Sequence, residues 1–420
     1  MSEPTTAAIP QPATDLPEPR SLLRRALLVA LVSRLGIFAI AAVTTYTVKM
    51  PPASWALRLP RLAEPFKGTL GHLFNPWAHW DGVWYIKIAS NGYTASDGSV
   101  AFFPLYPLLV RWLGVPFRNN LVISGMLISL VCFFVAVWLL YRLVARDFGH
   151  RVAYRTVWFI SIFPTAFYWQ AVYSESLFLM LSVACIMWAR EERWKLAGLA
   201  GLLAVLTRSA GFLLLVPMTV CYFEQRDWKL RRIDAQSASL LMVVEGLMVW
   251  MAYLSLGFGR PLLFAQVQDQ WHRSLLVPTT AIWRGLQSAT QGLRQVISRQ
   301  THHLYWPAPN AASVMPLAYA NLMNLTALAI AGLAIWYGLR RLPVAYSAFA
   351  IAAVGYPLLF PARFQPLLSM PRFVLAAFPL FISIALYTDE RPRTRVVVSV
   401  VFLIGLVLLT GKFAVFSWVA

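Results

Sequence analysis

Charged residues are scarce in this sequence. Only 13% of its 420 residues are charged, whereas 59% are hydrophobic and the mean hydropathy is +0.62. A soluble globular domain carries about 25% charged residues, so the charges present cannot cover a water-exposed surface of this size. The composition excludes an ordinary soluble protein and predicts an all-α polytopic membrane protein whose remaining surface faces lipid.

Acidic residues are scarcer still: 17 Asp and Glu stand against 36 Lys and Arg, which gives a net charge of +19. In a soluble protein this excess would suggest a nucleic-acid partner. Here the basic residues gather in short loops between apolar runs, the pattern that orients membrane proteins, so we expect no nucleic acid. Part of the excess also suits an anionic lipid substrate.

Cysteine patterns and nucleotide-binding motifs are missing too. Cys132, Cys185 and Cys221 all lie inside apolar runs and form no disulfide or zinc pattern. The absence of a Walker loop and of a dinucleotide fingerprint argues against direct use of ATP or NAD. His302 and His303 have no third metal ligand placed by the sequence. We therefore expect no cofactor, and a divalent cation stays an open alternative.

Long apolar runs dominate what is present. A membrane-spanning helix needs about 20 apolar residues, which here predicts about ten to eleven membrane helices. Residues 1–20 are rich in Pro, Thr and Ala and predict a disordered cytoplasmic N-terminus, followed by one transmembrane domain over 21–420. The predicted spans are 26–48, 121–144, 156–170, 174–189, 196–223, 237–258, 316–339, 344–360, 373–387 and 396–419.

Basic clusters between the spans indicate their orientation. The stretch 196–223 has basic residues at both ends, so we predict two short helices that turn near Arg208 and return to the same side. This arrangement puts two long loops, 49–120 and 259–315, on the extracytoplasmic side. The clusters expected on the cytoplasmic side lie at 142–155, 190–195, 226–232, 340–341 and 391–395.

The first long loop contains the densest group of aromatic and polar residues. Asp81 is a carboxylate among His79, Trp80, Trp84 and Tyr85. Such surroundings exclude water and suit a general base, and aromatic faces also stack against sugar rings. The alternative is structural: the aromatic residues would form an interfacial belt, and Asp81 would cap a helix that begins near residue 82. The residues alone favour neither of these two interpretations.

Other ionisable residues lie at span edges or inside apolar stretches. Glu175 begins a span, where the helix dipole alone would favour a carboxylate. Arg208 interrupts an apolar stretch, a position that predicts a functional site; its planar fork suits a phosphate, and the alternative is an ion pair with a carboxylate such as Glu175. Trp271, Arg273 and Arg372 lie in other predicted outer loops. Three Arg on one face would neutralise a lipid-linked phosphate.

Taken together, these motifs resemble the PIG-V family of the GT-C membrane glycosyltransferases. That family includes the transferase that adds the second mannose to the glycosylphosphatidylinositol core. The resemblance extends from the first outer loop to the penultimate span. It is carried by HWDGVWY at 79–85, FFPLYP at 102–107, YSESLF at 173–178, LTR at 206–208 and SMPR at 369–372.

The resemblance implies a polyprenyl- or dolichyl-phosphate sugar donor with mannose as the sugar, used without a nucleotide sugar. It implies that Asp81 is the catalytic carboxylate and leaves a second acid open between Glu175 and Asp97. The Arg-, Ala- and Leu-rich composition suggests a bacterial relative. The acceptor would then be a glycolipid, a polysaccharide or a protein.

We therefore predict an inverting mannosyltransferase in the plasma membrane, with its active site facing outward. The alternative is a transporter or flippase of lipid-linked sugars, which would need polar groups along a path near the midplane and often has inverted repeats. The expected catalytic residues are Asp81 and Glu175. The expected substrate-binding residues, which would hold the donor phosphate and line the sugar pocket, are His79, Trp80, Trp84, Tyr85, Tyr106, Arg208, Trp271, Arg273 and Arg372.

Overall fold

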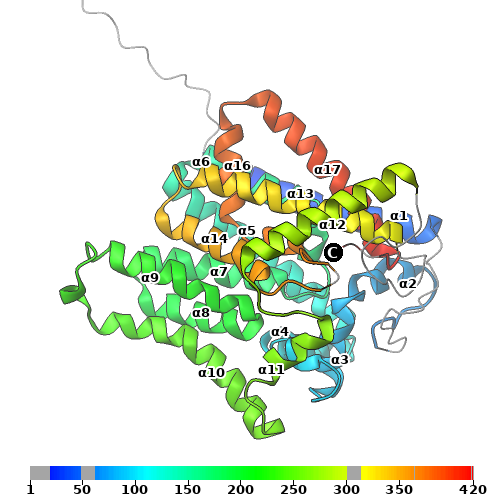
Figure 1. Cartoon of the computed structure of the whole chain (residues 1–420), viewed down its shortest axis with the longest axis horizontal. Helices are drawn as coiled ribbons and strands as arrows, with labels where there is room; N and C mark the ends of the chain where they lie inside the picture. The colour runs from blue at the N-terminus through cyan, green and yellow to red at the C-terminus, as the bar shows by residue number, and fades with distance from the viewer. Residues whose placement is uncertain (1–18, 49–61, 300–313, 364, 418, 420) are drawn as a thin grey trace, which may run out of the picture.

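The computed structural model describes residues 19–48, 62–299, 314–363, 365–417 and 419, and within them the chain is helical with no β-strand. Apolar runs in lipid form helices because every backbone polar group must then bond within its own segment. The helices (Figure 1) are α1 (Pro19–Thr47), α2 (Gly68–Phe74), α3 (Asp81–Asn91), α4 (Leu105–Gly114), α5 (Leu121–Phe148), α6 (His150–Ile162), α7 (Glu175–Arg190), α8 (Trp194–Thr207), α9 (Leu215–Glu224), α10 (Ala238–Phe258), α11 (Leu263–Gln266), α12 (Pro278–Ser298), α13 (Val314–Gly338), α14 (Val344–Leu359), α15 (Met370–Ala376), α16 (Pro379–Asp389) and α17 (Pro392–Ala414).

Within the described ranges, five helices are long and apolar enough to cross a membrane. The bent pair α15 and α16, whose axes differ by 79°, would make a sixth span. Shorter apolar helices, among them α8 and α14, pack between the long ones. The all-α polytopic membrane fold is therefore confirmed, whereas the count of ten to eleven crossings stays a prediction. The five long helices are Arg20–Thr47, Leu121–Phe148, Ala235–Phe258, Met315–Gly338 and Pro392–Ala414.

The stretch 196–223 forms two helices that return to the same end of the bundle, as its basic ends predicted. The Trp194 ring at the start of α8 lies 5.2 Å from the Tyr222 ring near the end of α9. The two helices turn at Arg208, whose backbone is extended. Gly211 makes the turn possible, because a Cβ there would lie 2.3 Å from the backbone of Ala204.

The span predicted over 156–170 is not continuous. Helix α6 ends at Ile162, and a short 3-10 turn begins at Ala166. The buried side chain of Arg34, in α1, donates hydrogen bonds to the carbonyl oxygens of Ser161 and Ala166, on the two sides of the break. The interruption is tolerated because an arginine from a neighbouring helix satisfies these freed backbone groups.

The two long loops contain helices of their own and meet at one end of the bundle. The first loop carries α2, α3 and α4, and the second carries α11 and α12. Figure 1 shows α3, α4 and α11 grouped at the same end of the molecule. Residues of both loops line one cavity together with the turn between α8 and α9. The two loops and the Arg208 turn therefore lie at the same end of the bundle, and their extracytoplasmic placement stays a prediction.

Candidate functional site

The shared cavity has a volume of ≈ 640 Å³, within the range of small-molecule sites. Six segments that are far apart in the sequence form its wall: the first long loop, the connection between α6 and α7, the turn after α8, the second long loop, the end of α14, and the segment around α15. Each contributes at least one polar side chain. One from each segment is Asp81, Tyr173, Arg208, Arg273, Tyr356 and Arg372.

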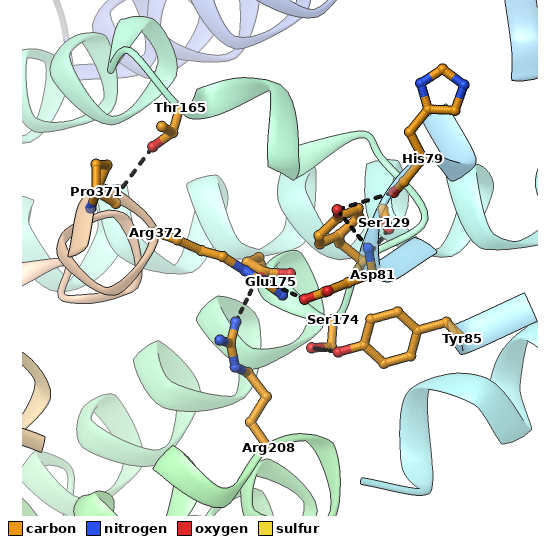
Figure 2. A network of polar contacts seen from close by, with 11 residues as sticks. His79, Asp81, Tyr85, Ser129, Thr165, Ser174, Glu175, Arg208, Pro371 and Arg372 are labelled. Atoms are coloured by element: carbon orange, nitrogen blue, oxygen red, sulfur yellow. Dashed lines mark hydrogen bonds and ion pairs between the residues drawn. The ribbon is translucent and has the colours of Figure 1, made fainter. Parts of the chain in front are cut away.

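Asp81 is the first residue of α3 and lines the cavity with a half-exposed side chain, which is 34% accessible. The residue before it, Trp80, has a positive φ of 56°, a conformation that non-glycine residues rarely adopt. The Tyr173 hydroxyl supports this turn: it donates to the carbonyl of His79 and accepts from the backbone N–H of Asp81, each at 3.1 Å. The carboxylate itself contacts Arg372 through Oδ2 (Figure 2). Its contact with a cavity arginine distinguishes it from a simple helix cap.

Glu175 lies behind the cavity wall and binds two arginines. Its side chain is fully buried at the start of α7. Its Oε1 accepts hydrogen bonds from Nη1 of Arg208 and Nε of Arg372 (Figure 2). Arg208 therefore forms the ion pair with Glu175 that the sequence offered as one alternative, and it also lines the cavity, whereas its binding of a phosphate stays a prediction. The geometry makes Glu175 the anchor of the two guanidinium groups, out of reach of a ligand in the cavity.

Arg372 joins the two acids. It is mostly buried in α15 and contacts Asp81 through Nη1 and Glu175 through Nε. Its guanidinium lies over the rings of Tyr168 and Tyr173, at 5.3 and 4.8 Å from their centroids, an arrangement that favours a desolvated cation. The side chain is thus held on three sides and presents a fixed positive charge to the cavity.

Arg273 differs from the other two cavity arginines because no ion pair joins it to an acid among the described residues. Its Nη1 donates a long hydrogen bond, 3.4 Å, to the carbonyl of Phe360. Burial lowers the pKa of Arg273; the nearby groups Tyr356 and Asp81 raise it, and Arg372 lowers it, for a net decrease. A cation in these surroundings is stabilised by an anionic ligand.

Three residues expected in the sugar pocket lie outside the cavity lining. The His79 ring is buried, with Nδ1 3.2 Å from the carbonyl of Phe413. Trp84 stacks on the Phe102 ring, whose centroid is 5.7 Å away. Tyr106 is fully buried, because its face of α4 turns towards α5, where its hydroxyl bonds Ser129 and the Gly125 carbonyl. These three side chains support the loop, whereas Trp80 and Tyr85 do line the cavity.

Asp97, the other candidate for a second acid, also lies outside the cavity lining. Its carboxylate pairs with Lys87 at 2.7 Å and accepts the backbone N–H of Ser99 at 2.9 Å. Burial raises the pKa of Asp97, but hydrogen bonds from Lys87, Thr94 and Ser99 outweigh it and hold the pKa well below its usual range. Asp97 is therefore engaged in folding the loop. The side chain of Trp271, and both His302 and His303, lie outside what the structure describes.

Several residues of the cavity wall were not predicted from the sequence. Tyr168 and Tyr173 flank the arginine cluster, and Tyr356 donates a hydrogen bond of 3.1 Å to Ser209 beside Arg208. Asp269, in the second loop, also lines the cavity with an exposed side chain. Only Tyr173 had a usable signal, its place two residues before Glu175. The described residues contain no group of three or more His, Cys, Asp or Glu arranged to hold a metal ion.

The known proteins that match this sequence are mannosyltransferases. The profile of the family described as Mannosyltransferase (PIG-V) matches residues 24–252. A GPI mannosyltransferase 2 of Drosophila pseudoobscura pseudoobscura is 29% identical over 119 residues, which cover 26% of each chain. The Schizosaccharomyces pombe protein of the same name is 30% identical over 158 residues, covering 36% of this chain and 32% of that protein. The alignments therefore span about a third or less of these relatives.

Solved structures resemble the chain weakly. A crystal structure of the Archaeoglobus fulgidus oligosaccharyltransferase in complex with Zn and sulfate is 16% identical, with a TM-score of 0.39 over 90% of this chain and 52% of that one. The archaeal oligosaccharyltransferase AglB from the same organism, in complex with an inhibitory peptide and a dolichol-phosphate, is 13% identical, with a TM-score of 0.36 over 91% of this chain and 55% of that one.

Proposed function

Because the chain belongs to the Mannosyltransferase (PIG-V) family, whose profile matches more than half of it, we propose that it is a GT-C type mannosyltransferase that uses a polyprenyl-phosphate-linked donor. The observation that carries the proposal is the position of Asp81. It is a half-exposed carboxylate in a cavity that also contains Arg208, Arg273 and Arg372. A base beside three cations suits transfer from an anionic, phosphate-linked sugar. A transporter is not favoured, because the cavity charges gather at one end of the bundle.

The reaction needs one base and one anion site. Oδ2 of Asp81 contacts Arg372, and its other oxygen, Oδ1, takes the proton of the acceptor hydroxyl. The acceptor oxygen then bonds to the anomeric carbon of mannose as the bond from that carbon to the phosphate oxygen breaks. The electron pair of the broken bond moves to the phosphate. The attack comes from the face opposite the leaving group, so the configuration inverts.

The arginines have different parts in binding the donor phosphate. Arg208 and Arg372 share Glu175, so their charges are partly compensated before the donor binds. Arg273 has no acid partner among the described residues and is the first anchor for the phosphate. As charge grows on the leaving phosphate, all three guanidinium groups stabilise it without having to move. Phosphate is already a good leaving group, so the site needs no strong general acid.

The acceptor and the location follow from the same proposal. The basic clusters at the opposite end of the bundle favour a cytoplasmic position for that end, which turns the cavity to the extracytoplasmic or lumenal side. A polyprenyl-phosphate sugar reaches that side after its carrier has been flipped. The acceptor is a glycolipid, a polysaccharide or a protein, and a plasma-membrane location and a bacterial origin stay predictions.

The direct test is a transfer assay with purified protein. The protein in lipid nanodiscs is incubated with radiolabelled polyprenyl-phosphate-mannose and a membrane lipid extract, and labelled products are separated and identified. We expect a labelled product that also names the acceptor, and none when GDP-mannose replaces the lipid-linked donor. Transfer from GDP-mannose in the absence of any polyprenyl phosphate would overturn the proposed donor.

A further inference from the structure

Helix α12 has the length of a membrane-spanning helix but not the composition. It contains 21 residues, yet it is not among the described helices that are apolar enough to cross a bilayer. Its sequence, PTTAIWRGLQSATQGLRQVIS, alternates apolar and polar residues with a helical period. Such a helix has distinct faces, and the surroundings of each face indicate where the helix lies.

The first face is made of small residues and packs against the protein. A Cβ added to Gly285 would lie 2.5 Å from Leu367, and one added to Gly292 would lie 2.7 Å from the carbonyl oxygen of Ala318. Close packing of this face fixes α12 against α13 and against the segment that leads into α15. The buried residues of this face are Ala281, Gly285, Ser288, Ala289 and Gly292.

The second face is apolar and exposed. At about 3.6 residues per turn, its residues form one continuous stripe beside the small-residue face. Large exposed side chains in a continuous stripe indicate a contact surface, whereas single exposed ones are ordinary. The exposed fractions are 42% for Ile282, 60% for Trp283, 42% for Leu286, 48% for Leu293 and 74% for Ile297.

The third face is polar and basic. It carries Gln287 and Gln291 with Arg284 and Arg294, and neither Asp nor Glu occurs anywhere in the helix. Trp283 lies at the boundary between the apolar and basic faces. An apolar stripe bordered by Trp and then by arginines is typical of a helix that lies in the headgroup layer of a membrane.

We propose that α12 lies in the interfacial layer of the bilayer, with its apolar stripe among the acyl chains and its basic stripe at anionic phospholipid headgroups. Two observations connect this surface to the cavity. The segment before α12 is bound to the end of α14, through the backbone bond from Leu276 to Leu359 at 2.9 Å. Gly285 contacts Leu367, five residues before Arg372. The membrane surface thereby supports two walls of the cavity, whatever reaction occurs there.

Site-directed spin labelling of the full chain in nanodiscs with anionic lipid tests this placement. Single cysteines are introduced at Ile282, Leu286 and Leu293, and at Gln287 and Gln291, after the three native cysteines are replaced by alanine. Accessibility to oxygen, which partitions into lipid, is compared with accessibility to a water-soluble nickel chelate. Ile404, exposed in the membrane-length helix α17, gives the lipid reference, and Lys229, exposed in a basic loop, gives the water reference.

We expect oxygen accessibility to exceed nickel accessibility several-fold at the first three positions, as at Ile404, and the opposite ratio at the two glutamines. Equal nickel accessibility on both faces would overturn the proposal, because the apolar stripe would then face water. Low accessibility to both reagents with dipolar coupling between labels would also overturn it, because a second copy of the chain would cover the stripe.

Discussion

Both termini of α7 carry ion pairs between arginine and a carboxylate, but the two clusters have different roles. At its first residue, Glu175 binds Arg208 and Arg372. At its last residue, Arg190 pairs with Asp147 at 3.3 Å, and Asp147 also contacts Arg146. Glu175 and Arg190, at the two ends of the 16-residue helix α7, are about 22 Å apart along its axis, since a helix rises about 1.5 Å per residue.

The difference lies in what each cluster faces. The arginines that bind Glu175 line the cavity, and one of them, Arg372, also contacts Asp81. In the Asp147 cluster the charged groups contact other protein side chains. The Tyr346 hydroxyl donates a hydrogen bond to Asp147, and the Arg190 guanidinium lies over the Tyr346 ring, 5.2 Å from its centroid. An ion pair in a membrane protein therefore predicts a function only when some of its charge remains available to a ligand. Substitutions at the two ends of α7 should therefore affect different properties: activity at the Glu175 end and stability at the Asp147 end.

Transfer activity should fall most when the acid that faces the cavity, Asp81, is replaced. Asp81→Asn is nearly isosteric but cannot take a proton at neutral pH, so transfer should fall by about 10²–10⁴-fold, the usual contribution of a general base. Arg372 keeps its contact with Glu175, and the lost contact is partly solvated, so stability should change by about 1 kcal/mol or less. Initial transfer rates and thermal unfolding of the purified variant measure the two quantities.

Asp97→Asn is the matched control in the same loop. It removes a carboxylate that pairs with Lys87 outside the cavity lining, so transfer per folded molecule should be unchanged. A folded Asp81→Asn protein that keeps more than half of its activity would show that Asp81 is not the base.

The second prediction concerns the effect of the buried residue Glu175 on stability. Glu175→Gln leaves two buried guanidinium groups without their carboxylate, and breaking a buried ion pair in this way costs about 3–5 kcal/mol. We expect a large drop in the unfolding temperature, with part of it restored when Arg208→Gln is added. If Glu175→Gln is instead as stable as the parent chain and inactive, Glu175 takes part in the chemistry directly.

The third effect is on donor binding. Arg208→Lys keeps the charge but loses the planar fork that matches a phosphate. Loss of one charge-assisted hydrogen bond, about 1.5 kcal/mol or more, should raise KM for the lipid-linked donor about tenfold. Arg190→Lys makes the same change at the other end of α7 and should leave this KM unchanged. Equal shifts in KM for both variants would mean that the change acts through folding.

Sequence reasoning found the helices whose signal is local. The run at 121–144 became α5, and the basic ends of 196–223 predicted the turn at Arg208, because hydrophobicity and charge act on each segment by itself. The break after α6 escaped notice because Arg34, which satisfies it, is more than 120 residues away in the chain. Helix α3 agrees with the alternative of a helix beginning near residue 82, whereas the other helices of the long loops escaped notice because they lack a long apolar run.

For the site, the sequence predicted the residues but not the directions of their side chains. Asp81, Arg208 and Arg372 do meet, because each lies in a segment assigned to the same side. Tyr106 belongs to an equally prominent motif, yet it packs against α5. A motif places a residue in a segment, whereas the face it presents depends on which neighbouring helix covers it. Tertiary packing alone decides that.

The smallest expected effect on activity comes from the far end of α7. Asp147→Asn weakens contacts with Tyr346, Arg190 and Arg146 in a largely buried position. Hydrogen bonds to charged groups contribute about 1.5–3 kcal/mol, so the unfolding temperature should fall. Transfer per folded molecule and KM for the donor should stay as in the parent chain, because Asp147 pairs with the end of α7 that is about 22 Å along the helix from Glu175, and the cavity keeps its own carboxylates. A transfer rate reduced tenfold with little change in unfolding temperature would contradict this expectation. It would mean that the charge pairs at the two ends of α7 act as one unit.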